Sequence, residues 1–285
     1  MRLGTRTFAP DELVVMGIVN RTPDSFYDRG ATYAAAAAVA AAERALDAGA
    51  DIVDIGGVPA GRGARVSVVQ EVDRVVEVIA ALRRRRPGAV ISVDTWRADV
   101  AREAVAAGAD LLNDAWEGHD PRVAEVAAQT GVGLVCTHAG HLPPRTDPHR
   151  PRYDDLVADV VRTVTGLAAN AVRAGVRSDG LLIDPGHDFG KTTAHSLEVT
   201  RRLDELAATG WPVLVALSNK DFIGETLDLP VPERLVGTLA ATTVAAWLGA
   251  RVFRAHNVLE ARQALDMTAA ILGHRPPARP HRGLG

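Results

Sequence analysis

Short apolar runs alternate with longer stretches of helical periodicity along the whole chain. Eight such runs are rich in Val, Ile and Leu, residues that favour strands. The expected strands are Val14–Val19, Ile52–Ile55, Val90–Val93, Leu111–Asn113, Gly133–Thr137, Leu181–Ile183, Val213–Leu217 and Val252–Arg254. Apolar residues between them recur at helical spacing, which predicts helices over 34–48, 69–85, 98–107, 122–129, 153–174, 194–208, 232–248 and 260–272.

Several of the expected helices end in the same way. A glycine next to a small residue precedes the next strand at Ala48-Gly-Ala50, Ala107-Gly-Ala109 and Leu248-Gly-Ala250. Glycine accepts the left-handed conformation that closes a last helical turn. Repeated helix–Gly–strand units indicate βα units with right-handed crossovers, and eight of them close a barrel. We therefore expect an α/β fold, a single-domain TIM (β/α)8 barrel. The alternative, an open doubly wound sheet, favours a Gly-x-Gly-x-x-Gly turn after the first strand, and none follows Val19.

Composition narrows the class of protein. The chain has 285 residues, 47% hydrophobic and 24% charged, as in ordinary globular proteins. We assign residues 1–275 to the barrel and residues 276–285, rich in Pro and Arg, to a flexible tail. A net charge of −3 gives no case for nucleic acid or a membrane surface. The first ten residues lack the apolar segment of a signal peptide, and the lone Cys136 fits buried filler in a reducing, cytoplasmic setting.

Polar side chains stand at the end of most expected strands. They are Asn20, Asp54, Asp94, Asn113, Asp184, Lys220, Arg254 and His256. In a barrel, the carboxyl ends of the strands carry the functional face. Two carboxylates, an amide and an ammonium group suit a flat heterocycle rich in N–H and C=O groups. A single strand-end Asp is also often only a helix cap, so the case depends on the set.

Three members of this set suggest a second subsite. Arg254 and His256 alternate along one strand, and Asn20 ends the neighbouring strand once the barrel closes. Arginine binds phosphate through two hydrogen bonds, so phosphate or diphosphate is the expected guest. Asn20 is an oxygen ligand suited to Mg²⁺ that bridges phosphates.

Two features have simpler interpretations. His138 and His141 resemble a metal-binding pair, but zinc sites need at least three protein ligands and no third ligand has recognisable spacing. Lys191 is compatible with a solvated loop charge.

Three long loops, 20–32, 56–67 and 138–152, are expected to cover the functional face.

Taken together, the motifs resemble dihydropteroate synthase. They occur in that family's order over nearly the whole chain, and the first and fifth are highly specific. The matching stretches are Met16-Gly-Ile-Val-Asn-Arg-Thr-Pro-Asp-Ser-Phe26, Asp54-Ile-Gly-Gly57, Ile91-Ser-Val-Asp-Thr95, Asn113-Asp114, Asp184-Pro-Gly-His-Asp-Phe-Gly-Lys191, Leu217-Ser-Asn-Lys220 and Arg254-Ala-His256.

The resemblance implies a barrel transferase of folate biosynthesis, usually a homodimer. It joins 6-hydroxymethyl-7,8-dihydropterin diphosphate to p-aminobenzoate and releases pyrophosphate with Mg²⁺. It also implies roles for individual residues. Asp94, Asp184 and Lys220 would be catalytic and, with Asn113, Phe26 and Asp28, would bind the pterin; Asn20, Arg254 and His256 would bind pyrophosphate, Asn20 with the metal; Phe189, Ser218, Asn219 and Arg62 would lie on the p-aminobenzoate side.

Departures from the family pattern are concentrated on the p-aminobenzoate side. Where the family has Glu-Ser-Thr-Arg-Pro-Gly, the chain has Val58-Pro-Ala-Gly-Arg-Gly63, with Arg62 displaced by one position. The family's Ser-Arg-Lys is Ser218-Asn-Lys220, and Arg21 replaces a small apolar residue. The chain therefore resembles a diverged second dihydropteroate synthase-like paralogue of some actinobacteria.

Three functions follow. The first is a working dihydropteroate synthase with a remodelled second loop. The second is a paralogue without that activity, which keeps pterin or phosphate binding or uses another substrate. The third, a pterin-binding methyl-transfer module, is disfavoured by the Phe-Gly-Lys and Arg-x-His elements.

Overall fold

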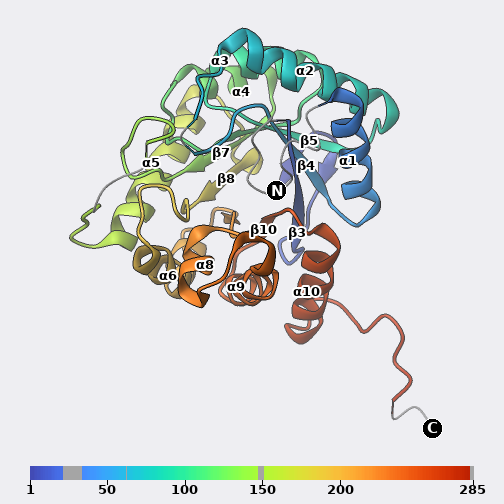
Figure 1. The fold of residues 1–285 in the computed structure, drawn as a ribbon, viewed down its shortest axis with the longest axis vertical. Coiled ribbons are helices and arrows are strands. Elements are labelled where there is room, and N and C mark those ends of the chain that lie inside the picture. Colours follow the sequence, from blue (N-terminus) through green and yellow to red (C-terminus); the bar gives the residue numbers. More distant parts are fainter. Residues whose placement is uncertain (22–33, 62, 147–150, 283–285) are drawn as a thin grey trace.

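Eight parallel strands form a closed ring in the computed structural model, which describes residues 1–21, 34–61, 63–146 and 151–282 (Figure 1). The order around the ring is β8-β7-β6-β5-β4-β3-β10-β9. The strands are β3 (Val14–Asn20), β4 (Ile52–Gly56), β5 (Val90–Asp94), β6 (Leu111–Asp114), β7 (Gly133–Thr137), β8 (Leu181–Asp184), β9 (Leu214–Val215) and β10 (Val252–Ala255). A parallel bridge between Ile183 and Val213 joins the two ends, and the Ile183 N–H donates to the Pro212 carbonyl at 3.0 Å. The predicted barrel is confirmed.

The barrel interior has an apolar floor. Successive side chains of a strand point to opposite faces of the sheet, so every second residue faces the barrel interior. The inward residues nearest the amino ends of the strands form one buried cluster: Val14, Met16, Ile52, Val90, Leu111, Val135, Leu182, Leu214 and Val252. Residues of the opposite parity, such as Val53 and Ile183, belong to the second cluster, between strands and helices. This register decides which polar side chains enter the barrel mouth.

A small hairpin, which was not predicted, closes the floor from below. Strand β1 (Arg2–Leu3) pairs antiparallel with β2 (Arg6–Thr7). Leu3 and Phe8 are almost completely buried and pack into the floor cluster. Each strand has only two residues, too few to show a period in the sequence. The plug leaves the opposite end of the barrel as the open one.

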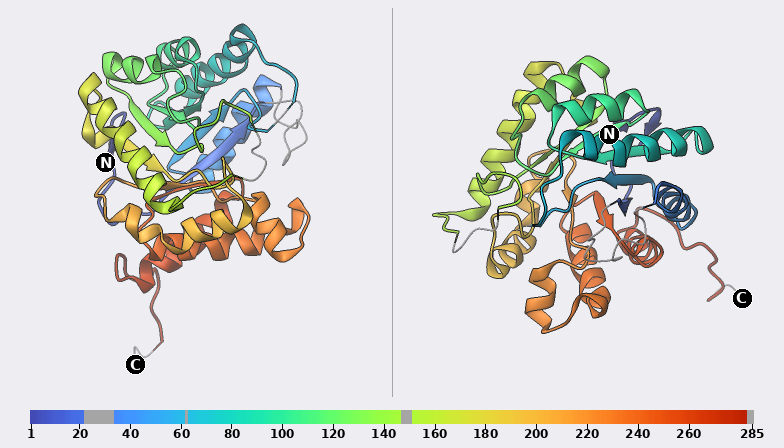
Figure 2. Two further views of the ribbon diagram at one scale, coloured as in Figure 1. Left: turned by 90° about the vertical axis from the view of Figure 1, so that its left-hand side faces the viewer. Right: turned by 45° about the horizontal axis from the view of Figure 1, so that its top comes forward.

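Helices surround the ring on the outside, as both views in Figure 2 show. They are α1 (Ala35–Asp47), α2 (Val68–Arg85), α3 (Ala98–Ala106), α4 (Arg122–Thr130), α5 (Leu156–Ala174), α6 (Thr193–Arg201), α7 (Leu203–Ala207), α8 (Asp221–Leu227), α9 (Leu235–Trp247) and α10 (Val258–Ile271). None of the helices among the described residues is long and apolar enough to cross a membrane. Beyond α10, residues 274–282 are exposed, have no helix or strand, and extend away from the barrel (Figures 1 and 2).

Four predicted boundaries were wrong. The helix expected over 194–208 is broken at Arg202, whose side chain binds Glu198 and Glu205. Helix α5 begins three residues late because Asp155 caps it by accepting from the Ala158 N–H at 3.1 Å. Residues 231–233 form a 3₁₀ turn before α9, and β9 is shorter than expected.

Helix α8 was missed altogether. Asp188, on the loop after β8, accepts hydrogen bonds from the N–H groups of Asp221 and Phe222 at 2.9 and 3.3 Å. A carboxylate at that position stabilises the helix start. Because this cap lies more than thirty residues away in sequence, no local pattern reveals it. The contact ties the loop after β8 to the helix that follows Lys220.

Candidate active site at the barrel mouth

The strand register places several polar side chains directly above the apolar floor. Asp54, Asn113 and Arg254 each follow a floor residue by two positions, as does Asp184. Side chains two apart on a strand share a face. Asp54 is fully buried, and Asn113 and Asp184 are 3% and 5% exposed. The predicted convergence of strand-end residues inside one barrel mouth is therefore present.

Arg254 links two carboxylates across the mouth. Its Nε donates to Asp54 Oδ2 at 2.6 Å, and its Nη2 donates to Asp94 Oδ2 at 2.9 Å. Asn113 Nδ2 donates to the same Asp54 oxygen at 3.1 Å. Among the described residues, Asp54 Oδ1 is buried without a hydrogen-bond partner. A buried carboxylate oxygen left in this way is an acceptor available to a ligand.

Asp94 is poised to change protonation near neutral pH. Burial raises its pKa to about 7, and the nearby Asp54 carboxylate adds to the rise while Arg254 opposes it. The carboxyl therefore exchanges a proton in the physiological range. When ionised, such a group accepts a hydrogen bond from a heterocyclic N–H; when protonated, it donates one to a carbonyl.

Asp184 and Lys220 occupy the opposite side of the mouth. Burial raises the pKa of Asp184, and the positive charges of Lys220, Lys191 and Arg254 oppose this rise. Its Oδ1 accepts from the Gly186 N–H at 2.7 Å. Lys220 donates to the His187 carbonyl and lies 4.6 Å from the centre of the Phe189 ring. Asp94 is bonded to Arg254, and Lys220 to a backbone carbonyl.

Gly186 brings the loop after β8 close to β7. Its φ is +66°, and a Cβ at that position would lie 1.9 Å from the His138 carbonyl oxygen. No other residue fits, so the Asp-Pro-Gly turn is required for the approach. The loop carries Phe189 and Lys191 into the mouth as a result.

Both lysines of the chain lie near this site. Only two of the 32 lysine and arginine residues in the sequence are lysines, Lys191 and Lys220. Lys191 is 7% exposed and donates to His138 Nδ1 at 2.7 Å and to the carbonyls of Gly186 and Phe189 at 3.0 Å. Burial lowers its pKa to about 7. The interpretation of Lys191 as a solvated loop charge was wrong. The rarity of lysine in the sequence was the signal that could have identified Lys191 as a site residue.

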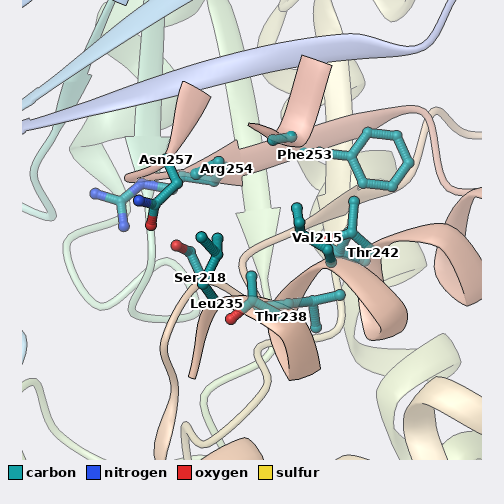
Figure 3. A pocket seen from close by; sticks show the side chains of 12 residues that line it. Val215, Ser218, Leu235, Thr238, Thr242, Phe253, Arg254 and Asn257 are labelled. Carbon is teal, nitrogen blue, oxygen red and sulfur yellow. The ribbon is translucent and has the colours of Figure 1, made fainter. Parts of the chain in front are cut away.

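His256 and Ser218 meet at the ends of β10 and β9. Ser218 Oγ accepts from the His256 N–H at 3.1 Å and lies 3.0 Å from His256 Nδ1. Figure 3 shows Ser218 and Arg254 beside an enclosed cavity of about 10 Å³ between β9, β10 and α9. A cavity of that size holds about one water molecule at most, so it is not a ligand pocket.

Oxygen atoms suited to Mg²⁺ lie near Asn20. A Cβ placed on Gly56 would be 3.1 Å from Asn20 Oδ1 and 3.9 Å from Asp94 Oδ2, so the two oxygens border the same piece of backbone. The partnerless oxygen of Asp54 belongs to the same mouth. Mg²⁺ is usually held by one or two carboxylates together with substrate phosphates. The residues present fit that ion.

The predicted p-aminobenzoate side is built differently. Asn219 is 2% exposed, its N–H donates to Thr238 Oγ1 at 3.1 Å, and its side chain lies against the same hydroxyl. Its φ of +57° suits asparagine. Residues Phe26, Asp28 and Arg62, also named as site residues, lie outside the described residues.

The second loop is held by basic side chains of neighbouring loops. Arg145 donates to the carbonyls of Gly61 and Ala64 at 2.9 and 3.0 Å, and Arg97 donates to the Val66 carbonyl at 2.9 Å. Arg97 also pairs with the fully buried Glu71. An open hollow of about 800 Å³ separates this loop from Trp96 and the 143–145 segment. Arg65, Arg97 and Arg145 are among the residues that line the hollow.

Two tryptophans that the sequence interpretation passed over pack with Phe189, a predicted site residue, beside the ends of the strands. Trp96 and Trp116 make an edge-to-face contact at 6.2 Å, and Trp116 makes another with Phe189 at 4.8 Å. With Ala139 they form a third apolar cluster. Each tryptophan comes shortly after a strand-end polar residue, so strand-end aromatics were the available signal.

The chain matches the family of pterin binding enzymes over residues 16–256. It is 56% identical to "Inactive dihydropteroate synthase 2" of Mycobacterium leprae over 98% of this chain and 97% of that protein. It is 39% identical to dihydropteroate synthase of Escherichia coli, over 93% of this chain and 94% of that enzyme. A structure of Yersinia pestis dihydropteroate synthase with a sulfonamide drug superposes with a TM-score of 0.91 at 36% identity, covering 96% of this chain and 99% of that one.

Fold and site thus define a parallel barrel protein whose buried polar side chains converge at the carboxyl ends of its strands. The chain belongs to the pterin binding enzyme family, within its dihydropteroate synthase branch. Its similarity is greater to the mycobacterial protein named inactive than to the E. coli enzyme. The resemblance inferred from the motifs is confirmed.

Proposed function

We propose that this protein binds 6-hydroxymethyl-7,8-dihydropterin diphosphate and joins it to p-aminobenzoate poorly or not at all. The observation that supports this most is the contrast within the barrel mouth. Asp54, Asp94, Asn113, Asp184 and Lys220 converge there, whereas Asn219 is buried against Thr238. The relative at 56% identity bears the name of an inactive protein.

In this proposal, the pterin ring lies between the two carboxylate groups of the mouth. Asp184 and Asp94 accept from ring N–H groups, Asn113 both donates and accepts, and Lys220 donates to a ring carbonyl or nitrogen. Phe189 and the Trp116 beside it exclude water, which strengthens each of these polar contacts. The carboxylates also stabilise positive charge that develops on the pterin methylene when pyrophosphate leaves.

The diphosphate lies toward β3 and β10 in this proposal. Arg254 supplies a planar donor fork, and His256 supplies a ring donor next to Ser218. Asn20, with Asp94 or Asp54, would hold Mg²⁺, which supplies charge neutralisation of the diphosphate when bound. The Arg254 guanidinium, which also pairs with Asp54 and Asp94, would supply positive charge to the bound anion.

A working dihydropteroate synthase is the second candidate. The E. coli relative bears that name, and the order of motifs is preserved from Asn20 to His256. If the second substrate is not oriented, the reaction loses the lowering of its activation barrier by proximity, which reaches about 7–11 kcal/mol for well-oriented reactants. The altered second loop is therefore enough to separate binding from turnover.

Pyrophosphate release from the dihydropterin diphosphate, with and without p-aminobenzoate, separates the two candidates. Dihydropteroate synthase of E. coli, assayed in parallel, is the positive control. We expect release by this protein to remain at the level of the p-aminobenzoate-free reaction. Release that depends on p-aminobenzoate at a rate near that of the E. coli enzyme would overturn the proposal.

We also propose that the chain forms a homodimer through α9 and α10. These helices pack side by side (Figure 1), and they expose Val236, Val244, Trp247, Leu259, Met267 and Ile271. Exposed apolar side chains gathered on adjacent helices are typical of protein interfaces. Light scattering should give the mass of a dimer, and Trp247→Glu with Ile271→Glu should give a monomer.

A further inference from the structure

Two histidines and an aspartate converge on one point beside the barrel mouth. His138 is the first residue after β7, and His141 follows three residues later. Asp159 lies on the first turn of α5. His138 Nε2 lies 3.0 Å from Asp159 Oδ2, and His141 Nε2 lies 3.2 Å from the same oxygen. The donor atoms of all three side chains are within 4.8 Å of one another. Asp159, on the following helix, is the third candidate ligand that sequence spacing did not reveal.

These spacings suit a transition-metal ion. Bonds of about 2.0–2.1 Å in tetrahedral geometry place ligand atoms about 3.3 Å apart. The two measured separations of 3.0 and 3.2 Å are close to that value. Two imidazoles and one carboxylate are the ligand set of zinc-class ions rather than of Mg²⁺, which prefers oxygen.

His141 is surrounded by negative charge in a way that calls for a cation. Its Nδ1 contacts Glu117 Oε1 and its Nε2 faces Asp159 Oδ2. A neutral imidazole has one N–H, so it satisfies only one of these carboxylates. The other contact needs either a second ring proton or a metal ion between nitrogen and oxygen. A carboxylate on the ring nitrogen opposite the metal is the usual support of a metal-bound histidine.

The rest of the cluster is already fixed in position. Glu117 Oε2 accepts from the N–H groups of Ala139 and His141 at 2.7 and 3.1 Å. Arg162 pairs with Asp159 Oδ1, so Oδ2 remains for the ion. His138 is fully buried, and the side chain of His141 is 56% exposed, which gives an ion a route from solvent.

We propose that His138 Nε2, His141 Nε2 and Asp159 Oδ2 form a binding site for one zinc-class divalent ion, with water as the fourth ligand. The ion displaces the proton on His138 Nε2, which goes to solvent. One Lys191 proton passes to His138 Nδ1 along their 2.7 Å hydrogen bond, so the ring binds as neutral imidazole. The ion joins the loop after β7 to α5, and the same loop holds the second loop through Arg145.

Titration of chelator-treated protein with Co²⁺, followed by visible absorption, tests the site. We expect one Co²⁺ per chain with the intense bands of tetrahedral coordination, displaced by Zn²⁺ and not by Mg²⁺. His141→Ala should lower affinity at least about tenfold, since loss of even a supporting residue costs 10–100-fold. Asp159→Asn should do the same, and both should keep the circular dichroism of the wild type.

His274→Ala is the matched control, because His274 is exposed and lies outside the cluster. It should bind Co²⁺ as the wild type does. Zn²⁺ should also raise the Tm of the wild type and of His274→Ala, but not that of His141→Ala. Equal Co²⁺ binding by wild type and His141→Ala, or no binding by the wild type, would overturn the proposal. Neither result depends on pterin binding, so failure here leaves the proposed function untouched.

Discussion

The two sides of the barrel mouth differ in what holds their polar groups. On the side proposed for the pterin, Asp54, Asn113 and Asp184 extend from strands, and their positions are set by the pleat above the apolar floor. On the side proposed for the second substrate, residues 58–61 and 63–67 have no helix or strand, and Arg145 and Arg97 donate to their carbonyls. A site on strands is preserved by the packing of the barrel, whereas a site on loops diverges at little cost to the fold.

We expect family membership and catalytic activity to depend on different parts of this molecule. The strand-end motifs carry the resemblance, while the loop that would orient p-aminobenzoate has lost its hydroxyls. Affinity for the first substrate and rate of the reaction are therefore expected to separate. The following experiments test that separation, beginning with the largest effect.

Removal of a pterin-side polar group should nearly abolish binding. Asp184→Asn and Lys220→Ala each remove a buried charged group proposed to bond the pterin, a loss of roughly 2–5 kcal/mol for a desolvated charged contact. Calorimetry should show at least about thirtyfold weaker binding of the dihydropterin diphosphate. Asp204→Asn, which changes an exposed carboxylate on α7, is the comparison variant. Unchanged affinity in Asp184→Asn would rule out this pocket.

Protonation of Asp94 should control pterin affinity near neutral pH. Its pKa is raised to about 7, so the carboxyl is mostly protonated at about pH 6 and mostly ionised at about pH 8. If the ionised form accepts from the pterin, affinity should rise about tenfold between these values, in proportion to the competent fraction. Calorimetry in buffers of different ionisation enthalpy should then show nearly one proton released per ligand at about pH 6. A flat profile without proton release would contradict this role.

Restoration of the second loop should give the smallest effect. A graft of Glu-Ser-Thr-Arg-Pro-Gly over residues 58–63 together with Asn219→Arg should raise p-aminobenzoate-dependent pyrophosphate release. Asn219→Arg alone should not, because the side chain is 2% exposed against Thr238, and overpacking there costs about 1–3 kcal/mol. Steady-state rates for the graft, the single variant and the wild type provide the check. Equal rates in all three would mean that the loop is not the missing element.

The sequence predicted the parts of the molecule that obey a local period. Strand positions, the barrel and the strand-end polar residues follow from alternation of apolar residues and from the glycines that end helices. Partners brought together by the fold were not predictable. Arg254 pairs with Asp54 and Asp94 across the mouth, and Asp188 caps α8.

Lys191 illustrates the same limit. It follows a glycine-rich turn and resembles a solvated residue, yet the approach of β7 to Gly186 buries it against His138. Cys136, by contrast, is buried as expected, and burial raises its pKa to about 12. Burial on a strand is a property of the local period, and burial on a loop is not.

Stepwise calorimetry with both substrates tests the contrast between the two sides most directly. Dihydropterin diphosphate with Mg²⁺ is titrated into the protein first, and p-aminobenzoate or a sulfonamide is then titrated into the saturated complex. The account predicts saturable binding of the pterin diphosphate, one per chain, and no measurable heat from the second ligand. Tight binding of p-aminobenzoate to the saturated complex, or no binding of the pterin diphosphate, would contradict it.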